Sequence, residues 1–131
     1  MTEYRNVASR AALAPGRLTK VEVDGREVAL ANVDGQLFAI ANKCTCIAHF
    51  AGHRESERVA VRRLATGRLA GATVACPLHG TVFDLRSGSP VSGFGDAPIS
   101  TYEVREAGDR IEIATMSDSE RLFWHDRAAA R

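Results

Sequence analysis

Residues 17–41 constrain the fold most strongly, because two Asp-Gly pairs divide them into three runs of alternating side chains. Asp24-Gly25 and Asp34-Gly35 are dipeptides that favour tight two-residue turns between antiparallel strands. Alternation of apolar and polar residues has the period of two that is typical of a strand. In the third run the two faces hold Leu37, Ala39 and Ala41 on one side and Phe38 and Ile40 on the other. We therefore predict an antiparallel meander with strands over 17–23, 26–33 and 36–41.

The meander leads into the first of two segments that hold all three cysteines and one of the four histidines. These segments are Cys44-Thr45-Cys46 and Cys76-Pro77-Leu78-His79-Gly80. Thiolate and imidazole are ligands of iron–sulfur clusters and of zinc, and two ligand pairs on separate loops can close around a metal from both sides. The residues predict a metal site with Cys44, Cys46, Cys76 and His79 as candidate ligands, and their types alone leave iron–sulfur and zinc open.

The rest of the chain predicts short strands, loops and one helix. Residues 49–63 are polar and rich in arginine, which favours a solvated loop or a short helix. We expect strands over 71–75, 81–84, 99–105 and 110–115, with a turn at 86–90, a loop at 93–98 and a turn at 106–109. Ser117-Asp118-Ser119-Glu120 has the form of a capping box, so we predict a helical tail over about 117–131. We expect Leu122, Phe123 and Trp124 to pack this helix against the sheet.

Length, charge and cysteine count exclude several classes of protein. The 131 residues can bury one core, so we expect a single domain over 1–131. The formal net charge is +1, which gives no reason to expect nucleic acid or an anionic membrane as a partner. An odd number of cysteines argues against a secreted disulfide scaffold. Since we find no apolar signal segment or bilayer-spanning run, we expect a soluble cytoplasmic protein.

The second ligand segment closely resembles a cluster-binding box of the Rieske-type iron–sulfur proteins. The likeness runs through Cys76-Pro77-Leu78-His79-Gly80-Thr81-Val82-Phe83-Asp84 to Gly88 and Pro90, and Asn42-Lys43-Cys44-Thr45 is similar to the start of the family's first box. With the strand pattern, the likeness covers roughly residues 5 to 115. It implies an all-β, antiparallel sandwich-like fold, a small cluster-binding subdomain at about 42–90, a [2Fe-2S] cluster and an electron-carrier activity.

The resemblance breaks at Cys46, because the first box of the family has the pattern C-x-H. Carried over to this chain, the family pattern implies that Cys44 and Cys76 bind the inner iron and that His79 binds the outer iron. The histidine place in the first box holds Cys46. The interval from Cys46 to Cys76 is also longer than is usual in the family, which implies an insertion within 49–63.

Three outcomes follow for the fourth ligand. Cys46 binds the cluster directly, or His49 or His53 replaces it, or no cluster assembles and the domain is degenerate or binds zinc. The first outcome is favoured, because thiolate is an ordinary cluster ligand and position 46 is where the family pattern needs one. Unless His49 or His53 is the fourth ligand, we expect His49, His53 and His125 to be surface residues. We expect Arg86 to be a solvated turn residue.

Three thiolates would change the charge of the cluster. An oxidised core of two irons and two sulfides carries +2, so two thiolates and two neutral imidazoles make it neutral, whereas three thiolates make it −1. The potential should then lie below that of a two-histidine cluster. Relative to high-potential members of the family, Thr81 takes a serine place and Phe83 a tyrosine place, and the phenyl ring cannot donate a hydrogen bond to a cluster sulfur. With only His79 able to lose a proton, the potential should depend less steeply on pH.

The resemblance implies a one-electron carrier between a flavin-dependent ferredoxin reductase and a terminal oxygenase. We expect no catalysis by this chain alone, because no arrangement of its residues suggests a substrate site. The alternative from another class is a non-redox Rieske-like subunit of a larger reductase or oxygenase, loaded with zinc or empty.

Overall fold

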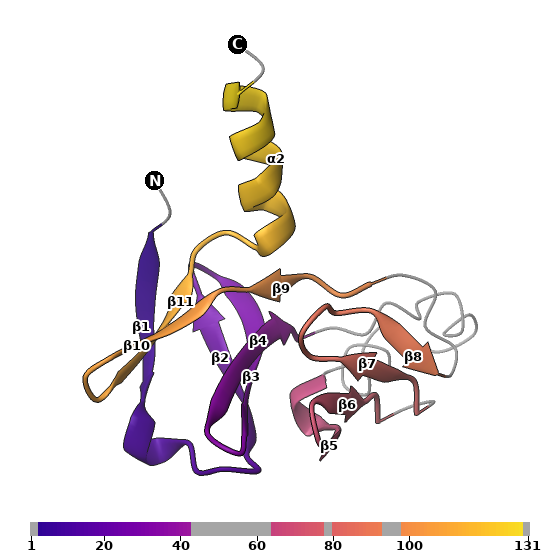
Figure 1. Ribbon diagram of the computed structural model, residues 1–131. Coiled ribbons are helices and arrows are strands. Elements are labelled where there is room, and N and C mark those ends of the chain that lie inside the picture. The colour runs from indigo at the N-terminus through magenta and orange to yellow at the C-terminus, as the bar shows by residue number, and fades with distance from the viewer. Residues whose placement is uncertain (1–2, 43–63, 78–79, 93–97, 130–131) are drawn as a thin grey trace.

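The computed structural model describes residues 3–42, 64–77, 80–92 and 98–129. Within these residues the chain forms three antiparallel sheets (Figure 1). Sheet A has the order β1 (Tyr4–Ser9), β11 (Arg110–Ala114), β10 (Val104–Ala107), and sheet B the order β2 (Leu18–Val23), β3 (Arg26–Val33), β4 (Gln36–Ala41), β9 (Thr101–Tyr102). Sheet C has the order β5 (Arg68–Ala70), β6 (Thr73–Ala75), β7 (Val82–Asp84), β8 (Pro90–Ser92). Two 3-10 turns, η1 (Arg10–Ala12) and η3 (Leu64–Thr66), and the helix α2 (Asp118–Ala129) complete the described elements.

The predicted meander is confirmed as strands β2, β3 and β4. Both turns have left-handed backbone at each central residue, with φ of 49° and 83° at Asp24 and Gly25 and of 52° and 94° at Asp34 and Gly35. Positive φ at both positions is the signature of the type I′ turn, whose twist matches that of the strands. The turns therefore fix the register, which pairs Val23 with Arg26 in the first hairpin.

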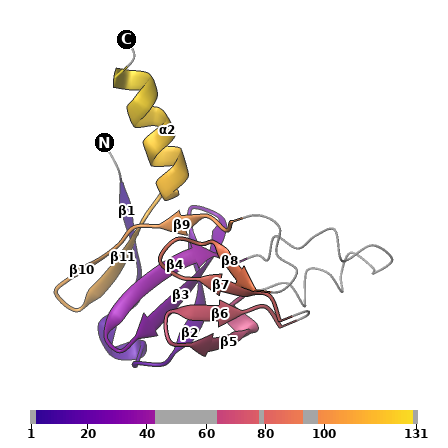
Figure 2. The same ribbon diagram turned by 45° about the vertical axis from the view of Figure 1, so that its right-hand side comes forward.

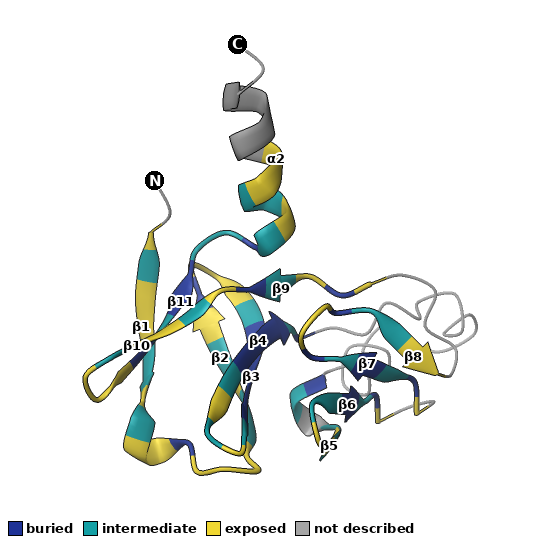
Figure 3. Ribbon diagram, in the orientation of Figure 1, coloured by how far each residue is buried: buried dark blue, intermediate teal, exposed yellow. Residues whose placement is uncertain are grey.

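Sheet B lies between the other two sheets, and both of its faces are buried (Figures 1–3). Strand β3 shows how, because Ala29 and Ala31 face one core while Val28 and Leu30 face the other. We call the core on the side of sheet C the first core; its buried members are Ala29, Ala31, Phe38, Ile40, Leu64, Val74, Cys76, Phe83, Leu85 and Ile99. The second core, toward sheet A, holds Leu13, Val23, Val28, Leu30, Ala39, Tyr102, Ile111 and Ile113. The layered antiparallel fold confirms the predicted all-β class.

The strand predicted over 99–105 is wrong as a single element. It divides into β9 and β10 around Glu103, because the chain changes sheets there. Strand β9 pairs with β4 in sheet B, whereas β10 pairs with β11 in sheet A. Strand β10 also continues to Ala107, so the turn predicted at 106–109 is reduced to Gly108 and Asp109.

Three short strands were not predicted, and two predicted boundaries move. Strands β1, β5 and β8 are additions to the expected set. Pro90 begins β8, although the turn was predicted to include it, and β6 begins at Thr73, after a turn at Gly71 and Ala72. Strand β1 adds to sheet A, whereas the other corrections change sheet C, whose strand β6 ends just before Cys76.

The capping box of the C-terminal helix is confirmed. The N–H of Glu120 donates to Oγ of Ser117 at 3.2 Å, and the N–H of Ser117 donates to Oε1 of Glu120 at 3.4 Å. This reciprocal pair satisfies donors that a helix start leaves open. The helix extends away from the sheets (Figures 1 and 2). None of the helices in the described part of the chain is both long and apolar enough to cross a bilayer.

The predicted packing of that helix against the sheet is wrong for Leu122 and Phe123, which are 59% and 53% exposed. The side chains of Trp124 and His125 lie outside the described residues. Polar contacts attach the first turn instead: Arg26 pairs with Glu120, and the hydroxyl of Thr101 donates to Oδ2 of Asp118 at 2.6 Å. The helix is therefore joined to the body by charge and hydrogen bonding at its N-terminal end.

Candidate metal centre

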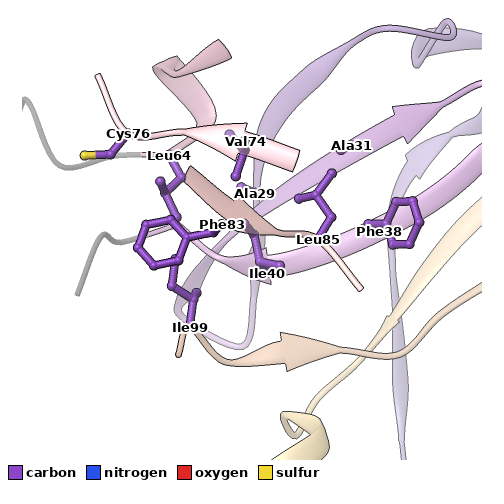
Figure 4. Packing of buried hydrophobic residues seen from close by; sticks show 10 residues of the cluster. All are labelled: Ala29, Ala31, Phe38, Ile40, Leu64, Val74, Cys76, Phe83, Leu85 and Ile99. Atoms are coloured by element: carbon purple, nitrogen blue, oxygen red, sulfur yellow. The ribbon is translucent and has the colours of Figure 1, made fainter. Parts of the chain in front are cut away.

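Cys76 directly follows strand β6 and marks the point where sheet C meets the predicted metal site. Cys76 is 2% exposed and belongs to the first core. Its sulfur nevertheless points away from the other nine side chains drawn in Figure 4. The core therefore screens this thiol from water, and the thiol lies just beyond the end of the strand.

Backbone hydrogen bonds close the second ligand segment into a tight turn. The N–H of Cys76 donates to the carbonyl of Thr81 at 2.8 Å, and the N–H of Gly80 donates to the carbonyl of Cys76 at 3.0 Å. Gly80 has a φ of +73°, in the left-handed region that glycine adopts without strain. The turn that holds Cys76 thus depends on a glycine four residues after the cysteine, which is the spacing in the resembled box.

The segment after this turn anchors it in the first core. Ala75 pairs with Val82 across strands β6 and β7, and Phe83 is fully buried one residue later. Thr81 is also fully buried. Phe83 lies on the core side of the segment (Figure 4), where its ring fills space and offers no hydrogen-bond donor.

The first ligand segment begins immediately after a buried polar residue, Asn42, which is 4% exposed. Its Oδ1 accepts a hydrogen bond from the N–H of Ala65 at 2.7 Å, and its Nδ2 donates to Oε1 of Glu27 at 3.3 Å. Its backbone N–H donates to the carbonyl of Glu27 at 3.1 Å. The chain therefore leaves strand β4 for Cys44 from a fixed point.

An exposed arginine and Cys76 line the same pocket. A surface pocket beside Cys76 is lined by Gly67, Arg68, Ala75, Cys76 and Pro77, and Arg68 is exposed. Arg86 is exposed as predicted, and its guanidinium carbon lies 5.5 Å from the centre of the Phe38 ring, at the opposite end of the drawn cluster from Cys76 (Figure 4).

The other predicted ligands, Cys44, Cys46 and His79, lie outside the described residues, as do the alternatives His49 and His53 and the predicted insertion at 49–63. The loop predicted at 93–98 falls largely outside them as well. Among the residues that are described, no three His, Cys, Asp or Glu side chains form a group that could hold a metal ion. Of the four predicted ligands, Cys76 is the one that lies within the described residues.

The residues present fit an iron–sulfur cluster. Cysteine thiolates are the usual ligands of such clusters and histidine replaces some of them in Rieske centres, so three cysteines and one histidine are a suitable donor set. Cys76 suits a cluster ligand, because its backbone is fixed by hydrogen bonds and its sulfur points away from the other drawn side chains of the first core.

Comparison with known families decides the relationship. The sequence profile of the Rieske-like [2Fe-2S] domain matches residues 3–114. The chain belongs to the Rieske-like [2Fe-2S] domain family. Its cofactor is therefore the Rieske-type [2Fe-2S] cluster, and the predicted fold and family are confirmed. The ligation by Cys46 remains a prediction.

Relatives within this family include ferredoxin components of oxygenase systems. The ferredoxin component of a naphthalene 1,2-dioxygenase system from Pseudomonas aeruginosa is 34% identical over 98 residues, which cover 75% of this chain and 82% of that protein. The ferredoxin of carbazole 1,9a-dioxygenase from Nocardioides aromaticivorans IC177 superposes with a TM-score of 0.71 and 30% identity, covering 86% of this chain and 98% of that one. A complex of reduced oxygenase and oxidized ferredoxin in carbazole 1,9a-dioxygenase gives a TM-score of 0.72 at 24% identity, covering 88% of this chain and 95% of that one, which shows the shared fold.

Two residues of the site had no assigned role in the sequence. In the sequence Asn42 stands out only through the likeness to the first box, because no neighbouring residue indicates that its side-chain amide reaches Ala65. Gly67 has no signal in the sequence, because its close approach to Ala75 depends on the pairing of β5 with β6, and β5 is not predicted. A buried asparagine next to a ligand segment is the one signal that could have indicated the first contact.

Proposed function

We propose that this chain is a soluble, cytoplasmic one-electron carrier that passes electrons from a flavin-dependent ferredoxin reductase to a terminal oxygenase. The observation that carries the proposal is the second ligand segment: Cys76 is fixed just after β6 with its sulfur pointing away from the other drawn side chains of the first core, within a chain that matches the Rieske-like domain. The [2Fe-2S] cluster supplies reversible one-electron chemistry when bound. The chain acts as an electron-transfer component and performs no catalysis alone.

The names of the relatives support the proposed partners. A protein 34% identical to this chain is the ferredoxin component of a naphthalene 1,2-dioxygenase system, and a structural relative at 30% identity is the ferredoxin of carbazole 1,9a-dioxygenase. This chain covers 82% and 98% of these two proteins, so the likeness extends over most of each carrier. Contacts between such carriers and their partners are small and short-lived, which suits repeated docking.

The proposed ligands of the cluster are Cys44, Cys46, Cys76 and His79. One additional negative charge at about 4 Å, with an effective dielectric constant near 20, corresponds to about 4 kcal/mol. For a one-electron step this is on the order of 0.1 to 0.2 V. The proposed potential is therefore lower than that of an otherwise identical cluster with two cysteines and two histidines.

Metal content, spectrum and electron transfer test the proposal together. We expect a red-brown protein with two irons and two sulfides per chain, visible charge-transfer absorption and reversible one-electron reduction. It should accept electrons from a flavin-dependent ferredoxin reductase and release them to a terminal oxygenase. A colourless protein with stoichiometric zinc after anaerobic expression with iron would refute the carrier function and favour the non-redox subunit.

A further inference from the structure

We infer that Asn42 is a positioning residue for the metal centre, because it joins the two ends of the segment that contains Cys44 and Cys46 and fixes them relative to Cys76. The inference rests on the cluster of the proposed function and holds whether or not Cys46 is a ligand. It concerns the described residues on either side of 43–63, which are Asn42 before the segment and Leu64 to Gly67 after it.

The contacts of Asn42 use both ends of its amide. Oδ1 accepts from the N–H of Ala65 at 2.7 Å, on the far side of the segment, while Nδ2 donates to Oε1 of Glu27 at 3.3 Å. At 4% exposure, water cannot easily replace either partner. A side chain at this position must therefore accept at one atom and donate at another. An ionised aspartate only accepts, and serine has a single, shorter hydroxyl for both roles.

The turn η3 carries this fixed point toward the second ligand segment. Leu64 begins the turn and is fully buried in the first core, and the N–H of Gly67 donates to its carbonyl at 2.9 Å. A Cβ added at Gly67 would lie 2.1 Å from the carbonyl oxygen of Ala75, the residue before Cys76. Only a residue without a side chain allows so close an approach. The path from Asn42 through Ala65 and Gly67 to Ala75 thus joins the two ligand segments.

Metal ligands must lie within about 0.2 Å of their preferred distances, so ligands from two segments depend on the relative position of those segments. Groups that orient ligands without touching the metal change affinity about 10- to 100-fold when they are removed. Asn42 has the contacts expected of such a group.

Asn32 provides a matched control for the test. It is 1% exposed, its Nδ2 donates to the carbonyl of Leu13 at 2.8 Å, and its Oδ1 accepts from the N–H of Gly35 at 2.8 Å. It thus makes the same two kinds of hydrogen bond from the same sheet, but its contacts join the turn regions far from Cys76 in the sequence. Asn42→Ser and Asn32→Ser should lower thermal stability to a similar extent.

The readout is the loss of iron from the loaded, full-length protein to a chelator below the unfolding temperature, followed by visible absorbance. We expect Asn42→Ser to release iron about tenfold faster than wild type or more, and Asn32→Ser to release it at the wild-type rate. The electron paramagnetic resonance spectrum of the reduced cluster should change in Asn42→Ser alone.

A charge-neutral exchange tests the contacts themselves. In Asn42→Asp with Glu27→Gln, the new glutamine donates to the new aspartate, which still accepts from the N–H of Ala65. We expect this double variant to recover most of the wild-type retention of iron, whereas Asn42→Asp alone should not. Should Asn42→Ser fail to fold, the double and single exchanges decide the question.

Gly67→Ala tests the second contact on the path. It should also accelerate the loss of iron. Gly71→Ala, in the turn between β5 and β6, meets nothing within 4 Å but is strained by a φ of +58°, so it controls for a loss of stability that does not involve the contact with Ala75.

Equal iron loss from Asn42→Ser and Asn32→Ser, or no recovery in the double variant, would overturn the inference while the cluster of the wild-type chain stands. A wild-type chain that takes up no iron would instead overturn the proposed function and the inference with it.

Discussion

Replacing Phe83 by alanine should lower the free energy of unfolding more than the same replacement at the surface. Phe83 is fully buried in the first core, on strand β7 at the centre of sheet C. Phe83→Ala would remove the ring from between sheets B and C. Phe123→Ala makes the identical chemical change at a residue that is 53% exposed, so the pair isolates the effect of burial.

The magnitude follows from the buried area. A phenylalanine side chain buries about 200 Å², which at about 25 cal/mol/Å² gives about 5 kcal/mol as an upper value, because an unfolded chain already buries part of this area. Measured Phe→Ala changes in cores cost about 3–5 kcal/mol. For Phe123→Ala we expect a change within about 1 kcal/mol.

Urea unfolding of the cluster-loaded protein under anaerobic conditions measures the difference. With an m-value of about 1.5 kcal/mol/M, Phe83→Ala should lower the midpoint by about 2–3 M, and the visible absorbance should disappear at correspondingly lower urea because Cys76 shares this core. Similar midpoints for the two variants would refute the assignment of the first core as the support of the metal site.

Three further substitutions test separate contacts. Ser117→Ala removes the acceptor for the N–H of Glu120, so we expect a loss of about 1 kcal/mol in a thermal unfolding scan, with Ser117→Thr close to wild type. The hydrogen bond from Arg26 lowers the pKa of Glu120, so this carboxylate stabilises the fold above its unfolded pKa of about 4.3 and ceases to do so as the pH falls through its folded pKa. Glu120→Gln, which keeps the capping box, should therefore be less stable than wild type at pH 7 and equally stable in strong acid, and a constant difference would contradict the pairing. Gly88→Ala should cost more than about 1 kcal/mol in the urea midpoint, because its φ is +76° and the new Cβ would lie 2.0 Å from the carbonyl oxygen of Ile99.

The elements that could be predicted are those with local signals. The meander of sheet B was found because Asp24-Gly25 and Asp34-Gly35 specify their own turns and the runs between them alternate with period two. The start of α2 was found because its capping box involves residues three apart. These signals act within a few residues, so a single sequence contains them.

The missed elements either depend on partners far away in the sequence or are too short to show a pattern. Strand β1 pairs with β11 from the other end of the chain, and β5 and β8 are only three residues long, too short to show a period. The change of sheets at Glu103 likewise depends on which strands lie on either side. The packing predicted for Leu122 and Phe123 was wrong because α2 is attached through ion pairs, one of which joins residues 94 apart.

The candidate site likewise has some residues with a local signal in the sequence and others without one. Residue types and spacing were enough to predict Cys76 as a candidate metal ligand, whereas the Rieske-type box was predicted from the resemblance to a known family, and the family match confirms the family and the cofactor. The amide contact of Asn42 joins residues 23 apart, and the close approach of Gly67 to Ala75 depends on the pairing of β5 with β6, so neither has a local pattern in the sequence.

The reduction potential of Cys46→His tests the central claim most directly, measured by voltammetry against the wild-type chain across a range of pH. If Cys46 is a ligand, the exchange of a thiolate for an imidazole should raise the potential by on the order of 0.1 to 0.2 V, make its dependence on pH steeper and shift the visible spectrum toward that of a two-histidine cluster. An unchanged potential and spectrum would contradict the three-cysteine, one-histidine site.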